Sequence, residues 1–247
     1  MSNKSVTEVQ KIQRILSIDI GVRNLAIWIE DFDKTKISEG EKKLQDIKKA
    51  DRTNQNNEAT QAYKTFLNDF MTTSSSTIYA DKIDLCDGKD GVKVSYTKNK
   101  MIILTNDILF NIIREFDKRR ELIRNVDVIV IEKQLKNNPN AQAIQNHIHA
   151  YFLHQYGLSK HVEIFDSCHK TRVLGCPRKI KESGSDKMIK INKSYRKRWT
   201  TNLTRDILML RKDKKFFDFV FNQNKVKADD LSDTFCQAYA YILLKIC

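Results

Sequence analysis

The chain has 247 residues, of which 40% are hydrophobic and 30% charged, and its formal net charge is +13. The apolar share is sufficient for a folded core, and no run approaches the roughly 18 apolar residues of a transmembrane helix, so we expect no membrane partner. The excess of Lys and Arg favours a polyanionic partner such as nucleic acid, although a solvated basic surface or contact with an anionic membrane surface would also fit the charge alone.

The sequence gives little information about the cellular compartment of the protein. The first residues, MSNKSVTEVQKIQR, lack the apolar core of a signal peptide, and the five Cys residues have no paired spacing. We therefore expect an intracellular protein in a reducing compartment.

The first predicted elements form a β-hairpin, because residues 15–20 and 25–30 are apolar and rich in β-branched side chains, with Gly21 between them. Residues 34–80 are polar and show little periodicity apart from the patch YKTFLNDF, so we interpret them as an insertion that is partly helical at best. Residues 81–98 hold short alternating stretches around two Asp-Gly pairs, which is typical of turns between short strands.

The middle of the chain alternates between helical and strand patterns. Apolar side chains recur at helical spacing over 105–124, and VDVIVIE at 126–132 predicts a strand that is buried on both faces. A second helix is predicted over 138–156, because Asn-Pro is a typical helix start and a Gly follows the last apolar position. VEIFD at 162–166 predicts another strand.

The last part of the chain is basic and then apolar. A basic segment spans 170–211 with a helix predicted near 200–210, and a final amphipathic helix covers about 229–246. Strands interleaved with helices predict an α/β fold in which a central mixed sheet is flanked by helices. We expect one domain over 1–247, interrupted by the insertion at 34–80.

Acidic residues occupy unusual places in this pattern. Asp19 lies inside an apolar strand, where an unpaired charge is costly, and Glu132 ends another apolar strand. Asp229, Asp230 and Asp233 lie in the first turns of the final helix, where the helix dipole favours their ionised form. Strand ends and a helix N-terminus can converge at one edge of a sheet, so these carboxylates are candidates for one site.

Converging carboxylates repel one another, and a divalent cation that prefers hard oxygen ligands, Mg²⁺ or Mn²⁺, relieves that repulsion. Two such ions can support phosphodiester hydrolysis by water without a covalent intermediate. Each residue also has an ordinary interpretation: acidic residues in a first helical turn are often caps, and a glutamate at a strand end is often a surface residue. The joint pattern is far more specific than any one member.

Three motifs, SIDIGVRNLA, VIVIEKQ and KADDLSD, resemble the RuvC-like Holliday junction resolvases, and most closely the poxvirus resolvase family with the related fungal mitochondrial resolvases. In the first motif the resemblance includes a basic residue and an Asn after Asp-x-Gly, here Arg23 and Asn24. It covers residues 15–30 and roughly 100–247, and it leaves the insertion at 34–80 without a counterpart.

This resemblance implies an RNase H-like fold and a homodimer with two active sites. It places the family's four metal-binding carboxylates on Asp19, Glu132, Asp230 and Asp233, with Mg²⁺ or Mn²⁺ as the cofactor. It also implies a catalytic lysine between the glutamate strand and the final helix, for which Lys170 is the candidate; one more basic residue of a DNA-binding groove is the other interpretation of that position.

Basic residues outside the carboxylate motifs are candidates for DNA contact. The stretch KINKSYRKRW interleaves cations with aromatic residues, which suits phosphate contacts and base stacking, although a solvated amphipathic helix would show the same pattern. The candidate DNA-binding residues are Arg23, Lys133, Lys136, Arg172, Arg178, Lys179, Lys193, Arg196 and Arg198.

The sequence therefore predicts a metal-dependent DNA endonuclease that resolves four-way junctions by paired phosphodiester hydrolysis, in viral or organellar DNA processing. A viral protein of this kind would act in the host cytoplasm. Two alternatives stay open: a nuclease of the same fold that acts on another substrate, such as an RNA–DNA hybrid, and a non-catalytic protein that binds branched DNA.

Overall fold

A five-stranded mixed sheet forms the centre of the computed structural model, which describes residues 11–86, 95–96, 102–182, 184–223 and 228–246. The strands are Ile12–Ile20 (β1), Asn24–Asp33 (β2), Ser75–Asp84 (β3), Val128–Glu132 (β6) and His161–Phe165 (β7). Their order across the sheet is β3-β2-β1-β6-β7. The first three strands pair antiparallel, whereas β6 pairs parallel with β1 and β7 parallel with β6.

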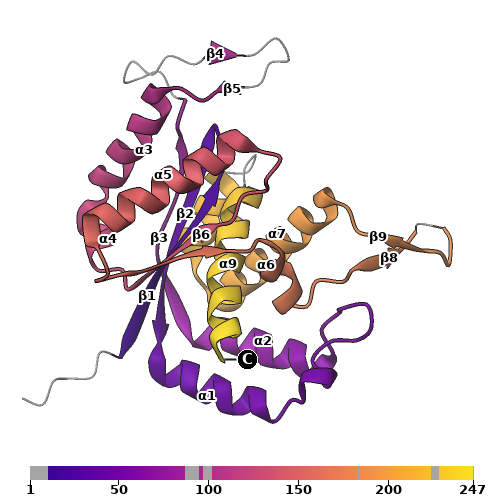
Figure 1. Cartoon of the computed structure of the whole chain (residues 1–247). Coiled ribbons are helices and arrows are strands. Elements are labelled where there is room, and N and C mark those ends of the chain that lie inside the picture. Colours follow the sequence, from indigo (N-terminus) through magenta and orange to yellow (C-terminus); the bar gives the residue numbers. More distant parts are fainter. Residues whose placement is uncertain (1–10, 87–94, 97–101, 183, 224–227, 247) are drawn as a thin grey trace, which may run out of the picture.

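Helices cover both faces of this sheet (Figure 1). On one face lie Asn106–Lys118 (α3), Arg120–Arg124 (α4) and Pro139–Tyr156 (α5). On the other lie Ala228–Ile246 (α9), Lys193–Leu210 (α7), Lys34–Gln45 (α1) and Gln61–Thr73 (α2). This order of strands and these directions are those of the RNase H-like fold, so the predicted fold class is confirmed.

The alternation of side chains along β1 explains why two separate cores form. Leu16 and Ile18 pack toward α3 and α5, whose inward side chains include Ile112 and Phe152. Ile15 points to the opposite face and packs with α9. Successive residues of a strand point to opposite faces, so an uninterrupted apolar strand can supply both cores at once.

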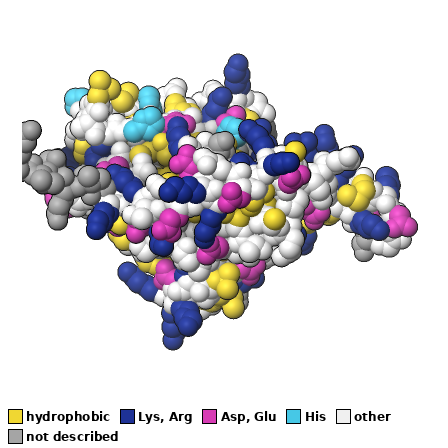
Figure 2. Space-filling model, turned by 90° about the horizontal axis from the view of Figure 1, so that it is seen from below, with side chains coloured by type: hydrophobic (Ala, Val, Ile, Leu, Met, Phe, Trp, Pro, Cys, Tyr) yellow, Lys and Arg dark blue, Asp and Glu magenta, His cyan; other side chains and the backbone are white. Residues whose placement is uncertain are grey.

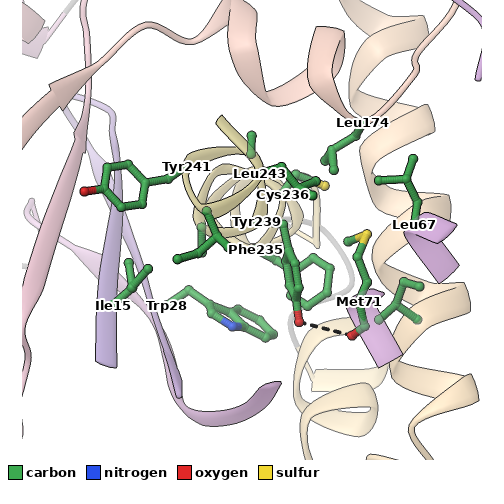
Figure 3. Packing of buried hydrophobic residues seen from close by; sticks show 14 of the residues in the cluster. Ile15, Trp28, Leu67, Met71, Leu174, Phe235, Cys236, Tyr239, Tyr241 and Leu243 are labelled. Atoms are coloured by element: carbon green, nitrogen blue, oxygen red, sulfur yellow. Dashed lines mark hydrogen bonds between the residues drawn. The ribbon is translucent and has the colours of Figure 1, made fainter. Parts of the chain in front are cut away.

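Helix α9 is buried on nearly every side (Figure 3). Phe235 meets the ring of Trp28 on β2 edge-on, with ring centroids 5.3 Å apart. Tyr239 lies beside Phe235, and its hydroxyl oxygen lies 3.2 Å from the backbone carbonyl oxygen of Met71. A helix that is buried on nearly all sides needs partners all round it, and α6, α7 and the sheet provide them.

One buried ion pair lies inside this second core. Arg211, just beyond α7, donates to Oε1 of Glu30 at 2.7 Å, and Tyr239 donates to the same oxygen at 2.9 Å. The indole of Trp28 donates to Oε2 at 2.8 Å. Because both carboxylate oxygens accept hydrogen bonds, the fully buried Glu30 is compensated, and the pair ties the end of α7 to β2.

The segment after the first hairpin is more regular than the sequence suggests. Helices α1 and α2 occupy most of 34–80, and the last residues of that range already belong to β3. The prediction of partial helicity is confirmed, but the sequence indicates neither α1 nor the start of β3 within this range. Tyr63 and Phe70 of α2 are buried, and α2 packs against α1 and α7, so tertiary packing stabilises helices whose own sequence is too polar to indicate them.

The remaining elements are short. Part of the predicted turn region at 81–98, residues 87–94 and 97–98, lies outside the described residues, and β3 extends to Asp84. The short elements are Lys49–Asp51 (η1), Ser95–Tyr96 (β4), Ile102–Ile103 (β5), Cys168–Val173 (α6), Lys179–Lys181 (β8), Met188–Lys190 (β9), Lys214–Phe217 (α8) and Asp218–Gln223 (η3).

The β8–β9 hairpin projects from the body of the molecule (Figure 1). Seen from below, Lys and Arg side chains are spread over the surface with acidic side chains between them, and they continue onto this hairpin (Figure 2). Within the described residues, no helix has the length and apolar character needed to cross a membrane.

Candidate active site

Two neighbouring strands end at the same edge of the sheet and bring two of the predicted carboxylates together. Asp19 is the last but one residue of β1, and Glu132 is the last residue of β6. The two strands run parallel with Ile18 opposite Ile131, so their carboxyl ends coincide. Burial, followed by the charge of Glu132, raises the pKa of Asp19 well above its ordinary value, and the two carboxyl groups share a hydrogen bond.

Glu132 is the partner that stays ionised. Burial alone would raise the pKa of its carboxyl group, but the hydrogen bond from Asp19 and the ammonium group of Lys170 lower that pKa to about 2. The side chain of Gln134 also donates to Oε2 of Glu132, at 3.2 Å. Two acidic side chains in one small space are thus held in different protonation states, as expected when like charges are brought together without a cation.

Helix α9 brings the third carboxylate, Asp233, to the same place. One turn further along, the buried amide nitrogen of Gln237 contacts Oγ of Ser17 at 3.1 Å and the carbonyls of Ile18 and Val130 at 3.2 Å each. Side chains four residues apart lie on the same face of a helix. The anchor at Gln237 therefore points Asp233 toward the ends of β1 and β6.

Lys170 joins these groups. It lies on α6, directly after β7, and its Nζ contacts Oε1 of Glu132 at 2.8 Å and Oδ2 of Asp233 at 3.0 Å. Only 9% of its side chain is exposed. Burial alone would lower the pKa of Lys170, but the carboxylates of Asp19, Asp233 and Glu132 raise it above its ordinary value. The lysine therefore stays charged at the centre of the acidic cluster.

The fourth predicted carboxylate, Asp230, lies beside this cluster with a lysine of its own. Nζ of Lys197 on α7 lies 3.4 Å from Oδ1 of Asp230 and makes a closer ion pair with Asp229. Asp229 is the flanking residue to which the resemblance gives no role. The structure thus brings Asp19, Glu132 and Asp233 together around Lys170 and holds Asp230 at their side.

Four of these groups, those of Glu132, Asp233, Lys170 and Lys197, line a cleft of about 440 Å³ between the ends of β6 and β7, α6, α7 and α9. Its acidic floor includes Glu132 and Asp233, and Thr200 on α7 holds Asp233 by donating to its Oδ1 at 2.8 Å. Cations form its rim. They are Lys133, Lys193, Arg196 and Lys197.

The predicted DNA-binding residues divide into two groups. Lys133, Lys193 and Arg196 line the cleft, and Lys136 follows in the exposed loop that leads from β6 to α5.

The other predicted cations lie outside the cleft. Arg23, in the turn between β1 and β2, pairs with Asp84 at 3.2 Å, and Arg172 donates to the ring of His169 at 2.7 Å. Arg198 projects from another side of α7, where its guanidinium lies over Tyr195.

Arg178 and Lys179 begin the β8–β9 hairpin. Asn56, from the segment between α1 and α2, fixes their backbone, because its carbonyl accepts from the nitrogen of Arg178 at 2.7 Å and its side chain exchanges two hydrogen bonds of 2.7 Å with Lys179. The side chains of both cations are exposed. The segment after the first hairpin thus supports the base of the projecting hairpin.

The cluster has the chemistry of a site for a hard divalent cation. Its donors are carboxylate oxygens, the ligands that Mg²⁺ and Mn²⁺ prefer, and the raised pKa of Asp19 reflects their crowding. Among the described residues, no group of three or more acidic, His or Cys side chains is already arranged around one point for a metal. Lys170 and Lys197 instead pair with the carboxylates, whose oxygens are the donors that such an ion prefers.

Three residues that contact the cluster or the strands beneath it were not among the predicted site residues, although Lys197 lies in the basic stretch KINKSYRKRW. Lys197 and Thr200 lie in a helix rich in cations and hydroxyls, where nothing in the sequence separates the side chains that face the cleft from those that face solvent. Gln237 carries a weak signal, because an amide is unusual on the apolar face of the last helix.

Comparisons with known proteins give few matches, and no family model matches the sequence. The chain is 30% identical over 135 residues to the uncharacterized protein 170L of Invertebrate iridescent virus 6. The matched region covers 51% of this chain and 54% of that protein. It is 29% identical over 135 residues to the uncharacterized protein 97L of Invertebrate iridescent virus 3, with shares of 55% and 57%. The chain therefore spans about half the length of the curated relatives it matches.

Among solved structures, the chain is similar to the Fowlpox virus resolvase, whose crystal structure is a complex with its substrate, Holliday junction DNA. The superposition has a TM-score of 0.49 at 17% sequence identity, and it covers 93% of this chain and 97% of that chain.

Proposed function

We propose that this chain is a metal-dependent endonuclease that cleaves branched DNA, and above all four-way junctions. The observation that carries the proposal is the meeting of Asp19, Glu132 and Asp233 around Lys170 at one edge of the sheet. Glu132, Asp233 and Lys170 line a cleft that also has a basic rim. Buried carboxylates below a cationic rim suit a phosphodiester substrate, because the rim binds the phosphates and the carboxylates hold cations.

In this proposal Asp19, Glu132, Asp230 and Asp233 hold Mg²⁺ or Mn²⁺. Such ions, when bound, polarise the scissile phosphate and help to generate hydroxide from water at neutral pH. The crowding of Asp19 and Glu132 fits this role, because a bound divalent cation would relieve the repulsion between the two carboxylates. Water is the expected nucleophile, and the product carries a 5′-phosphate.

Lys170 has a separate part in the proposal. Its ammonium group stays charged among the carboxylates and is held at 2.8 Å and 3.0 Å from Glu132 and Asp233. A cation that is already positioned can stabilise negative charge on the phosphate in the transition state without costly reorganisation. Thr200 fixes the orientation of Asp233 from the opposite side.

Four-way junctions are the preferred substrate class because the three carboxylate motifs resemble those of the junction resolvases. Paired cleavage needs two active sites, and each chain contributes one such cleft, so we propose a homodimer. Both curated relatives come from viruses, which agrees with a role in viral DNA processing inside the host cell, and in the cytoplasm for a virus that replicates there.

Competition between substrates tests this proposal. Labelled four-way junction, RNA–DNA hybrid and linear duplex of the same sequence are incubated separately with the protein and Mg²⁺, and then together in pairs. We expect the junction to be cut fastest and to suppress cleavage of the other two. Preferential cleavage of the hybrid would replace the junction assignment with the RNase H-like alternative.

A non-catalytic junction-binding protein is the other alternative. The partnership of Lys170 with Glu132 and Asp233 disfavours it. Burying several charges costs desolvation energy, and a catalytic site is a reason for a protein to carry that cost. Tight junction binding with no cleavage in either Mg²⁺ or Mn²⁺, from a folded sample, would favour it.

A further inference from the structure

Two lysines line the acidic cleft, and the ammonium group of each lies near two carboxylates. Lys170 lies between Glu132 and Asp233, and Lys197 lies between Asp229 and Asp230. Each lysine thus contacts two carboxylates. The protein's own side chains therefore offset part of the negative charge of the site.

The two lysines differ in their freedom to leave. The side chain of Lys170 is 9% exposed and is enclosed by the carboxylates of β6 and α9, whereas that of Lys197 is 33% exposed. Lys197 also lies at the cleft surface, on the same wall of α7 as Lys193 and Arg196. A long, flexible side chain at the rim can exchange one anionic partner for another at little cost.

Asp229 completes the arrangement. The ion pair of Lys197 with Asp229 is closer than its 3.4 Å approach to Asp230. Asp229 therefore acts as the main anchor that keeps the ammonium group near Asp230, one of the proposed metal ligands. This gives a purpose to a carboxylate that the resolvase motif leaves without a role.

We infer that Lys197 is a placeholder cation: it stands beside Asp230 when metal is absent, and an incoming divalent cation displaces it from that carboxylate. The released ammonium group is then available to a phosphate of the DNA at the cleft rim. This inference rests on the proposed function. It differs from the role given to Lys170, which stays in the buried cluster whether or not metal is bound.

The placeholder lowers the apparent metal affinity, because the site accepts a cation only in the fraction of molecules whose lysine has moved away. If that fraction is about a tenth, removal of the ammonium group tightens binding about tenfold. A substitution that keeps the charge and the approximate length of the Lys197 side chain should leave its competition with the metal ion unchanged.

Calorimetric titration of the full chain with Mn²⁺, without DNA, tests the inference. The variants are Lys197→Met, Lys197→Arg and the matched control Lys193→Met. Lys193 lies on the same cleft wall, but among the described residues it forms no ion pair with a carboxylate. Circular dichroism and thermal unfolding verify that each variant is folded.

We expect Lys197→Met to bind Mn²⁺ about tenfold more tightly than the natural sequence, with Lys197→Arg and Lys193→Met within about twofold of it. Equal or weaker binding by Lys197→Met would overturn the inference, as would an equal gain in Lys193→Met, which would indicate only a general charge effect. If these failures occur while the natural protein binds Mn²⁺ and cuts junctions, the proposed function stands and only the placeholder is lost. Absence of Mn²⁺ binding in every variant would refute both.

Discussion

Thr200 fixes the orientation of the carboxylate that completes the acidic cluster. Its hydroxyl donates to Oδ1 of Asp233 at 2.8 Å, while Lys170 contacts Oδ2 at 3.0 Å. With both oxygens held from opposite sides, Asp233 has a fixed orientation before any cation or DNA arrives. Partners of this kind commonly affect metal affinity or activity as much as some ligands do.

Replacement of Thr200 by Val tests this role. Val has nearly the same shape but no hydroxyl, so we expect single-turnover junction cleavage to slow by about tenfold with little change in junction affinity. Thr204→Val is the matched control, since Thr204 lies one turn along α7, is equally buried, and donates to the carbonyl of Thr200 instead of to a carboxylate. Equal slowing in the two variants would indicate a packing effect and contradict the proposed role.

At the scale of single residues, the sequence identifies candidates that interrupt a hydrophobic pattern. Asp19 and Glu132 stand out because they interrupt apolar strands, and both prove to lie in the acidic cluster. Lys197 and Thr200 break no pattern, because polar residues are expected on an exposed helix. Their position at the cleft depends on how α7 packs against α9, which no local pattern in the sequence determines.

Among the elements, helix α3 is attached to the edge strand β3 by a network around Arg119, the residue that follows α3. Its guanidinium donates to Oε2 of Glu115 at 2.7 Å and to the hydroxyl of Tyr79 at 3.0 Å, and it pairs with Asp81. Glu115 also accepts from Lys118 at 2.6 Å. The network joins a helix of one layer to the edge of the sheet.

Stability at acid pH reports on this network. Burial alone would raise the pKa of Glu115, but Lys118 and Arg119 lower it below its ordinary value of 4.5 in the folded protein. The group therefore contributes stability that is fully present above about pH 4.5 and is lost as the pH falls through the lowered pKa. We expect Glu115→Gln to reduce the free energy of unfolding by about 1 kcal/mol at pH 7.

The difference between Glu115→Gln and the natural protein should shrink as the pH is lowered from 5 toward 3, as measured by urea unfolding. Glu121→Gln is the control, because the side chain of Glu121 is well exposed and its pair with Arg124 spans 3.7 Å. A difference that stays constant with pH would show that the charge of Glu115 does not contribute through this network.

The elements also show where prediction from the sequence succeeds. The strands β1, β2, β6 and β7 are apolar runs, and the long helices α5 and α9 have clear periodicity, so all six were predicted with ends close to the observed ones. Strand β3, SSTIYADKID, is polar at an edge of the sheet, and it becomes a strand because it pairs with β2. Its assignment depends on a partner far away in the sequence.

At the scale of the whole molecule, Lys and Arg side chains are spread over the face seen in Figure 2, and only some of the cations of the chain line the acidic cleft. Arg196 lines the cleft, whereas the exposed Arg124 lies just before the start of β6, at the opposite end of the strand that Glu132 ends. If DNA crosses the cleft, these two arginines should differ in their effect on binding, although each adds the same charge.

The salt dependence of junction binding distinguishes the contribution of Arg196 from that of Arg124. Each phosphate contact contributes about one to the slope of log affinity against log salt, so we expect Arg196→Gln to reduce the slope by about one and to weaken binding at low salt. Arg124→Gln should leave the slope within error of the natural protein. Equal effects from both would mean that the whole basic surface binds DNA without a defined path.

The claim that Asp19, Glu132 and Asp233 form a catalytic centre for branched DNA is tested most directly by cleavage of a synthetic four-way junction. The junction and a linear duplex of matched sequence are incubated with the natural protein or with Asp19→Asn, in Mg²⁺ or in EDTA. We predict cleavage that needs both the junction and Mg²⁺, and a loss of at least about a hundredfold in rate with Asp19→Asn while junction binding persists. Junction cleavage by Asp19→Asn at the natural rate, or in EDTA, would contradict the account.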